Sequence, residues 1–320
     1  MMNSQHYGHV EPSGNIVKVQ SEELTRELNV PELISSFLAA QDVRPISKEL
    51  YKKGLERFLS WLETNGVRQP DREAVLKFKT FLQDEGLSAG TVNSYLVAVK
   101  RFFAWLEGCR KYPNIAKDIK GIKQPKGHLR ESPTVSQVKD MLAQIDRATL
   151  QGHRDFALIN LMARTGLRTI EVIRANVEDI KQESGEALLF VQGKGRDSKD
   201  EFVLLTEASL KPILEYLKAR GKAKPGDPLF SSHSDRNGGQ RLTTRTLRQT
   251  AKDAFRSIGV DRKKLSAHSL RHFFATQSLK AGAPLLQVKE AMRHVSIETT
   301  QKYLHNLERV EKGAERYIDF

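Results

Sequence analysis

The sequence predicts a mainly α-helical protein built from two domains, with one small β-hairpin or sheet. Apolar residues recur at helical spacing through most of the 320 residues. A basic stretch that contains proline and glycine, residues 111–130, interrupts this pattern and predicts a linker. Residues 187–205 read instead as two short strands around a Gly-Lys-Gly turn. A chain of this length is sufficient for two domains with separate cores.

The first domain is expected at residues 31–110, where the apolar pattern predicts four amphipathic helices. The fourth of them carries Val92, Leu96, Val99 and Phe103 at helical spacing. Such a stripe is typical of a helix that faces a core. Residues 1–30 contain Gly, Pro and Ser without sustained periodicity, which predicts a flexible arm too short for a further folded domain.

The second domain is expected at residues 131–320 and is predicted to be mostly helical. Its exception is the hairpin, with strands at 187–192 and 201–205. The linker before it carries spaced basic residues, which suit contact with a chain of phosphates, although a plain solvated linker has the same composition. These residues are Lys117, Lys120, Lys123, Lys126 and Arg130.

The charge balance favours a polyanionic partner. Lys and Arg number 52 against 39 Asp and Glu, a formal net charge of +13. Charge alone does not separate such a protein from one that is merely basic. Cys109 is the single cysteine, which excludes an intramolecular disulfide and a thiolate metal cage and suits a reducing cytosol. Because no apolar run approaches about 20 residues and no signal peptide is recognisable, we expect a cytoplasmic protein without a membrane partner.

Several residues form a set suited to attack on a phosphate. A helix-like string begins His268-Ser-Leu-Arg271, and Tyr303 follows His294 by nine positions. A further arginine, Arg168, ends the string Thr-Gly-Leu-Arg. Guanidinium groups match phosphate oxygens bidentately, imidazoles transfer protons, and a phenol can be a covalent nucleophile. A lone His-x-x-Arg is a weak signal, because a second copy begins at His233 in a loop-like stretch.

Taken together, these residues resemble the tyrosine recombinases, the phage-integrase and Xer-like family of site-specific DNA recombinases, from about position 30 to about 310. The resemblance implies a two-domain clamp, with an N-terminal helical, SAM-like core-binding domain and an α-rich catalytic domain. It also implies double-stranded DNA with a specific recombination site as the partner, and a homotetramer on two DNA sites. The reaction would proceed through a 3′-phosphotyrosine, with no cofactor, metal or ATP. The setting would be a prokaryotic nucleoid or a mobile element.

The same resemblance assigns the catalytic roles. Arg168 and Arg271 would hold the non-bridging oxygens, and His294 would donate to one of them. His268 would be the base or hydrogen-bond partner near the phenol, and Tyr303 the nucleophile. Lys194 in the hairpin turn would protonate the leaving 5′ oxygen, because a lysine pKa moves readily near phosphates. Lys199, from the same turn, is the competing assignment.

Three neighbours of these residues bear on the site. Glu171, at i+3 from Arg168 on one helix face, is expected to orient that guanidinium. His272 is interpreted as structural, facing away from the site; pairing it with His268 as a zinc site is disfavoured, because no third ligand is evident. Arg293 stands where family members often have glycine, in Leu-Gly-His, so it puts the loop packing in doubt and is a candidate DNA contact.

The polar edge of the fourth helix, the linker and the second domain supply the candidates for DNA contact. They are Asn93, Ser94, Lys100, Arg101, Lys120, Lys123, Lys126 and Arg245. The apolar residues after Tyr303 suggest a tail that docks on a neighbouring copy. Two alternatives to recombination are a type IB topoisomerase-like or hairpin-forming strand transferase and a catalytically silent DNA-binding regulator. The complete catalytic set argues against the regulator.

Overall fold

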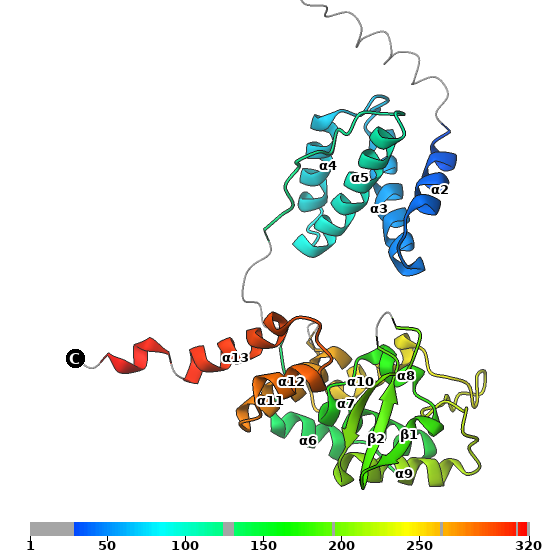
Figure 1. Ribbon diagram of the computed structural model, residues 1–320, viewed down its shortest axis with the longest axis vertical. Helices are drawn as coiled ribbons and strands as arrows, with labels where there is room; N and C mark the ends of the chain where they lie inside the picture. Colours follow the sequence, from blue (N-terminus) through cyan, green and yellow to red (C-terminus); the bar gives the residue numbers. More distant parts are fainter. Residues whose placement is uncertain (1–28, 124–130, 194–195, 263–264, 312, 319–320) are drawn as a thin grey trace, which may run out of the picture. The chain divides into compact units, whose positions relative to one another are not determined.

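The computed structural model describes residues 29–123, 131–193, 196–262, 265–311 and 313–318, with residues 306–311 described for the backbone only. The chain forms two compact units, Met1–Gly127 and His128–Phe320 (Figure 1). Both are mainly helical, and the second contains one small sheet. The predicted fold class is therefore confirmed. No helix among the described residues is long and apolar enough to cross a membrane.

The N-terminal unit contains the four predicted helices within its described residues. They are α2 (Val30–Ala40), α3 (Pro45–Thr64), α4 (Arg72–Asp84) and α5 (Ala89–Gly108). Side-chain caps begin three of them, because Asn29, Asp71 and Ser88 each accept a hydrogen bond from a backbone N–H of the first turn. The apolar stripe of α5 packs against α3 and lies in the core, as its spacing predicts.

The predicted linker differs from the structure in its first half. Residues 111–123 fold onto the helical unit, with Ala116 and Ile119 buried in its core. Lys79 on α4 donates to the carbonyl of Lys120 at 2.9 Å. The side chain of Asn93 on α5 accepts from the backbone N–H of Ile122 at 2.7 Å and donates to its carbonyl at 2.9 Å. Sequence reasoning found the composition of a linker but not these tertiary contacts.

The second unit surrounds a buried central helix, α7 (Leu150–Thr165), which packs against α9 (Glu207–Arg220) and α11 (Ala267–Lys280). Its sheet is antiparallel in the order β1 (Ile180–Glu183), β2 (Glu186–Val191), β3 (Glu201–Leu205). The predicted hairpin corresponds to β2 and β3, in which Leu189 pairs with Val203. The first strand was not predicted. The remaining elements are α6 (Val135–Ala143), α8 (Thr169–Arg174), η1 (Val177–Asp179), α10 (Thr244–Arg256), α12 (Leu285–Ala291), α13 (Ile297–Glu311) and η2 (Ala314–Tyr317).

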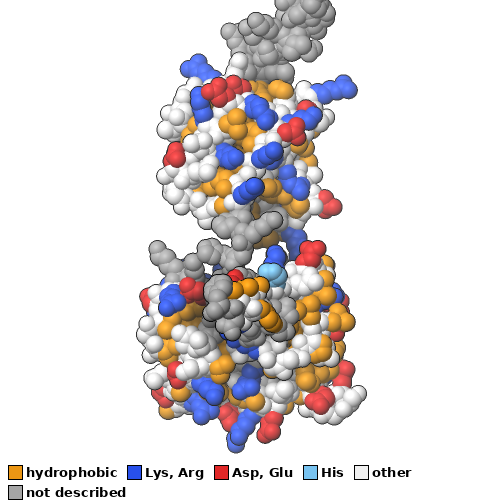
Figure 2. Space-filling model, turned by 90° about the vertical axis from the view of Figure 1, so that its left-hand side faces the viewer, with side chains coloured by type: hydrophobic (Ala, Val, Ile, Leu, Met, Phe, Trp, Pro, Cys, Tyr) orange, Lys and Arg blue, Asp and Glu red, His pale blue; other side chains and the backbone are white. Residues whose placement is uncertain are grey.

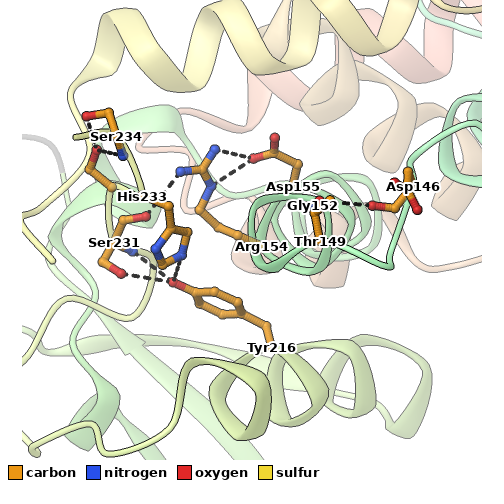
Figure 3. A network of polar contacts seen from close by, with 10 residues as sticks. Asp146, Thr149, Gly152, Arg154, Asp155, Tyr216, Ser231, His233 and Ser234 are labelled. Atoms are coloured by element: carbon orange, nitrogen blue, oxygen red, sulfur yellow. Dashed lines mark hydrogen bonds and ion pairs between the residues drawn. The ribbon is translucent and has the colours of Figure 1, made fainter. Parts of the chain in front are cut away.

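A polar network joins α7 and α9 to the loop at 231–234 (Figure 3). The buried guanidinium of Arg154 pairs with Asp155 at 2.7 Å and donates to the carbonyl of Ser231 at 3.2 Å. The hydroxyl of Tyr216 on α9 lies 3.0 Å from the Ser231 hydroxyl and 3.1 Å from Nε2 of His233. The second His-x-x-Arg string thus begins with a histidine that takes part in this structural network.

The last three helices form a small apolar cluster separate from the main core. Ala275 of α11, Val288 of α12, Met292 and Tyr303 of α13 are its buried members. Tyr303 is therefore placed by packing against two other helices. The end of α13 and the segment after it project away from the body of this unit (Figure 1).

Candidate active site

The turn between α7 and α8 places the first arginine. Gly166 caps α7 with a left-handed backbone, φ 62°, and a Cβ there would lie 2.5 Å from the ring of Phe274. Only glycine satisfies both conditions without strain. Leu167 is buried next to it, and Arg168 follows at the start of α8 with its side chain about a quarter exposed. The Thr-Gly-Leu-Arg string therefore forms a tight turn. This turn places the Arg168 guanidinium at the edge of the core.

Glu171 holds that guanidinium as expected. One carboxylate oxygen accepts from Arg168 Nη1 at 2.7 Å, and the other accepts from the backbone N–H of Arg168 at 2.7 Å. Burial of the fully enclosed Glu171 favours the neutral acid, but Arg293 and Arg168 outweigh burial and hold its pKa below the ordinary value.

The side chain of Arg293 does not lie where the DNA contact considered in the sequence analysis would require it. Its side chain is 3% exposed, and its Nη2 donates to Glu171 at 2.8 Å while its Nη1 donates to the carbonyl of Ala291 at 2.6 Å. The carbonyl of Arg293 in turn accepts from Arg168 Nη2 at 2.9 Å. A buried side chain engaged in this way is not placed for a DNA contact, so that interpretation is wrong. The loop closes around Arg293 instead.

Arg271 is the most deeply buried cation of the site. It is 2% exposed and donates to two backbone carbonyls, those of Gly166 and Met292. Burial lowers its pKa to about 9, with Arg168 adding to the effect. Because carbonyls orient a guanidinium without neutralising it, Arg271 keeps its charge for an anion. The guanidinium groups of residues 168, 271 and 293 outnumber the one carboxylate among them, so this region favours a bound anion.

His294 follows Arg293 and lies beside the arginines. Its Nδ1 is 2.8 Å from the hydroxyl of the buried Thr300. Burial lowers the pKa of His294 to about 4, and the charges of Arg271 and Arg168 act in the same direction. His294 is therefore neutral at pH 7. It lines a groove of about 870 Å³, which Arg196 and Asp200 from the β2–β3 connection also line.

The side chain of Tyr303 contacts His272, which the sequence analysis predicted to face away from the site. Its phenol oxygen is hydrogen-bonded to Nδ1 of His272, and the two rings lie 5.2 Å apart. His268 packs edge-on against His272 with ring centres 4.7 Å apart. The prediction that His272 faces away from the site is wrong, because positions four apart on a helix share a face. That spacing was the available signal.

The hairpin lysines are only partly described. Lys194 lies outside the described residues, as does Lys126 of the linker. Lys199 is ion-paired with Asp179 at 2.5 Å. Among the described residues there is no group of three or more His, Cys, Asp or Glu side chains arranged to hold a metal ion. Independence from metal stays a prediction.

The other candidate DNA contacts are distributed over both units. Arg101 is exposed and its guanidinium lies 5.5 Å from the ring centre of Tyr51. Asn93 is engaged with the backbone of Ile122, as described above, so its side chain has a structural role. Lys120, Lys123 and Arg245 are exposed, and Ser94 and Lys100 are half-buried. Lys and Arg side chains gather over the middle of one face of the N-terminal unit (Figure 2). Contact with DNA stays a prediction for all of these residues.

The two-unit helical fold and a site that combines buried arginines, histidines and a tyrosine are the features of a DNA strand-transferring enzyme. Comparison with known proteins gives the family. Residues 133–309 match the phage integrase family, and residues 34–108 match the phage integrase N-terminal SAM-like domain. The chain is 30% identical over 266 residues to the tyrosine recombinase XerD of Listeria monocytogenes, covering 80% of this chain and 86% of that one. The chain belongs to the phage integrase family of tyrosine recombinases.

Other relatives and solved structures agree with this membership. The XerD of Pseudomonas putida is 30% identical over 287 residues, covering 85% of this chain and 92% of that one. The fold is shared with the XerH recombinase bound to its difH substrate, at a TM-score of 0.70 and 23% identity over 93% of this chain and 89% of that one. It is also shared with the Tn1549 transposon integrase in complex with DNA, at a TM-score of 0.65 and 18% identity over 85% of this chain and 93% of that one.

Proposed function

We propose that this protein is a site-specific DNA recombinase that cuts and rejoins double-stranded DNA through a covalent bond between Tyr303 and a 3′ phosphate. The observation that carries this proposal is the hydrogen bond between the Tyr303 phenol and His272 in a site where buried Arg271 and Arg168 lie close to His294. A phenol beside a proton acceptor and an excess of fixed positive charge is the arrangement that attack on a phosphodiester requires.

The chemistry balances without an external energy source. The Tyr303 oxygen forms a bond to phosphorus while the bond from phosphorus to the 5′ oxygen breaks, and the 5′ oxygen leaves with a proton. Religation reverses these changes, so the energy of the phosphodiester is retained in the phosphotyrosine and neither ATP nor a metal is needed. Arg168 and Arg271 stabilise the charge that develops on the non-bridging oxygens, as prepositioned donors do in other phosphoryl and acyl transfers.

Histidines and a lysine move the protons. His272 Nδ1 receives the phenol proton, and His268 packs against that ring. His294 acts as a neutral donor to a phosphate oxygen through Nε2, because the Thr300 hydroxyl can donate to its Nδ1. Lys194 gives the proton to the 5′ oxygen. Two observations support Lys194: the β2–β3 connection lines the groove that His294 lines, and the amine of Lys199 is paired with Asp179.

The assembly would be a homotetramer on two DNA sites, in the cytoplasm and on chromosomal or mobile-element DNA. The projecting end of α13 and the exposed side chains beyond it, Tyr317 and Ile318, support a tail that docks on a neighbouring copy. The similarity to the bacterial tyrosine recombinases XerD of Listeria monocytogenes and Pseudomonas putida supports a bacterial cytoplasm as the setting. Lys120, Lys123, Arg101 and Arg245 supply exposed charge for the DNA backbone.

The test is recovery of a covalent protein–DNA adduct, resolved on a denaturing gel, from the full chain incubated with fragments that flank its gene. Tyr303→Phe should bind DNA as the wild type does and form no adduct, because only the phenol oxygen is lost. Tyr317→Phe is the matched control and should form the adduct. Wild-type binding without an adduct would indicate a silent regulator. Nicking and resealing without exchange between two sites would indicate a topoisomerase-like enzyme.

A further inference from the structure

Arg293 has a backbone conformation that is energetically unfavourable for a residue other than glycine. It is the residue that reverses the chain after α12: its N–H bonds the carbonyl of Glu290 at 2.8 Å, and the N–H of His294 bonds that of Lys289 at 3.1 Å. Its φ is 52°, in the left-handed region that favours glycine. A side chain in this conformation at a reaction centre calls for a compensating interaction.

That interaction is a closed ring of three residues. The Arg293 guanidinium holds Glu171, Glu171 holds the Arg168 guanidinium, and Arg168 donates to the Arg293 carbonyl. A glycine in place of Arg293 would keep the carbonyl but lose the guanidinium. The ring joins the turn that carries His294 to the helix start that carries Arg168, two segments more than 100 residues apart in sequence.

We infer that Arg293 is a positioning residue, which through Glu171 fixes the Arg168 guanidinium relative to His294 and keeps this arrangement intact as the pH falls. The inference rests on the proposed function for its catalytic consequence. Glu171 is fully buried, so its carboxylate persists only because charged partners face it. These partners are Arg168 at the start of α8, Arg293 after α12 and, at longer range, Arg271 on α11.

The direction of the pH effect follows from the Glu171 carboxylate. Its pKa in the folded protein is below the ordinary value, so its contribution is present above the unfolded pKa and is lost as the pH falls through the folded pKa. Removal of Arg293 takes away the largest favourable charge on Glu171 and raises that pKa. The neutral acid would then form at a higher pH, and Arg168 would lose its ionic partner there.

The experiment compares Arg293→Met with the wild-type full chain, measuring the initial rate of covalent adduct formation on a fragment that the wild type cleaves. The ratio of variant to wild-type rate should fall steadily as the pH is lowered from about 8 towards about 4. For a Glu171 pKa displaced by about one unit, the fall approaches about tenfold once the pH is below that pKa in both proteins. Arg220→Met is the matched control, because Arg220 is also nearly buried and paired, with Asp227, but outside the site. Its ratio should not change with pH.

The variant Arg293→Gly distinguishes the effect of losing the guanidinium from the effect of relieving the backbone strain. It should melt at a higher temperature than Arg293→Met, because glycine relieves the left-handed backbone, and yet show the same fall in rate ratio. A pH-independent ratio for Arg293→Met, an equal fall for Arg220→Met, or a pH-independent ratio for Arg293→Gly would each overturn the inference.

A second measurement needs no DNA and so separates this inference from the proposed function. The melting temperature of the full chain is compared for Arg293→Met, Glu171→Gln and the double variant. If Arg293 acts through Glu171, the loss caused by Arg293→Met should be less than about half as large in the Glu171→Gln background. Additive losses would overturn the inference even if adducts form. Absence of any wild-type adduct would instead count against the proposed function alone.

Discussion

At the residue scale, the Tyr303 phenol is hydrogen-bonded to His272, which we propose accepts its proton. In model compounds a phenol holds its proton with a pKa near 10 and an imidazole with one near 6.5, so transfer between them is uphill by about 5 kcal/mol in water. The buried charge of Arg271, which interacts with Tyr303, favours the phenolate. His272 can therefore act as a general base for the phenol only because the arginines lie nearby.

We predict that His272→Asn slows adduct formation by about 10²- to 10⁴-fold near pH 7, the usual contribution of a general base. The asparagine oxygen can still accept the phenol hydrogen bond that Nδ1 accepts, but it cannot take the proton. The rate of the variant should continue to rise at alkaline pH after the wild-type rate has levelled off, since the phenol must then ionise to solvent. Initial rates of adduct formation across pH measure this. Superimposable profiles would return His272 to the structural role first expected for it.

Residue types in local strings, together with the family resemblance that those strings carry, were sufficient to predict that Arg168, Arg271, His294 and Tyr303 belong to one site. The same reasoning failed for Arg293, whose burial depends on Glu171, a residue far away in sequence. It also failed for the direction of His272. Sequence spacing indicates which side chains share one face of a helix. Which residues that face contacts is decided by tertiary packing.

At the element scale, α7 is held at its start by a polar network and at its end by the Gly166 turn. The network lies around Arg154 and Tyr216 (Figure 3), and the turn leads directly to Arg168. Polar groups in such a position stabilise only if each finds its partner. The Tyr216 hydroxyl meets that condition, since it accepts from the Ser231 N–H at 3.2 Å and contacts the Ser231 hydroxyl and His233.

We predict that Tyr216→Phe lowers the free energy of unfolding of the catalytic unit by about 1 to 3 kcal/mol, the cost of leaving a buried polar partner unsatisfied. Chemical denaturation followed by circular dichroism measures this change. Adduct formation per folded molecule should stay at the wild-type level, because the network contains no residue of the site. Leu214→Ala, an exposed position on the same helix, is the control and should change stability by less than about 0.5 kcal/mol. A cleavage defect without a stability defect would contradict a structural role.

Helices with long amphipathic patterns were predictable as elements, and α2 to α5 illustrate this. Two elements were not. The strand β1 is short and mostly exposed, so its residues show no alternation, and it exists because β2 offers it a partner edge. Residues 111–123 have the composition of a linker, yet Ala116 and Ile119 fill gaps in a core formed by other helices. Both cases depend on contacts that a local pattern does not contain.

At the scale of the whole molecule, the net charge of +13 and the projecting C-terminal segment are the features that reach beyond a single copy. Basic side chains on the N-terminal unit and on the catalytic unit (Figure 2) favour a polyanion through counterion release, without selecting a sequence. The segment after α13 is different, because it exposes apolar side chains: Tyr317 is 79% exposed and Ile318 63%. Large exposed apolar groups at a chain end suit contact with another protein surface.

The last prediction concerns assembly. Tyr317→Ser combined with Ile318→Ser should leave binding to a single half-site unchanged, because residues 314–318 include none of those assigned to DNA or to catalysis. The double variant should weaken formation of the four-copy complex. Two exposed apolar side chains that become buried contribute about 1.5 to 3 kcal/mol each, so the concentration needed for the complex should rise by at least about tenfold. Native gels with a DNA substrate that traps the covalent intermediate report binding and assembly in one lane series. Leu214→Ser removes a comparably exposed apolar side chain on α9 and serves as the control. If the double variant assembles at the wild-type concentration, the tail packs within its own chain, and another surface must join the copies.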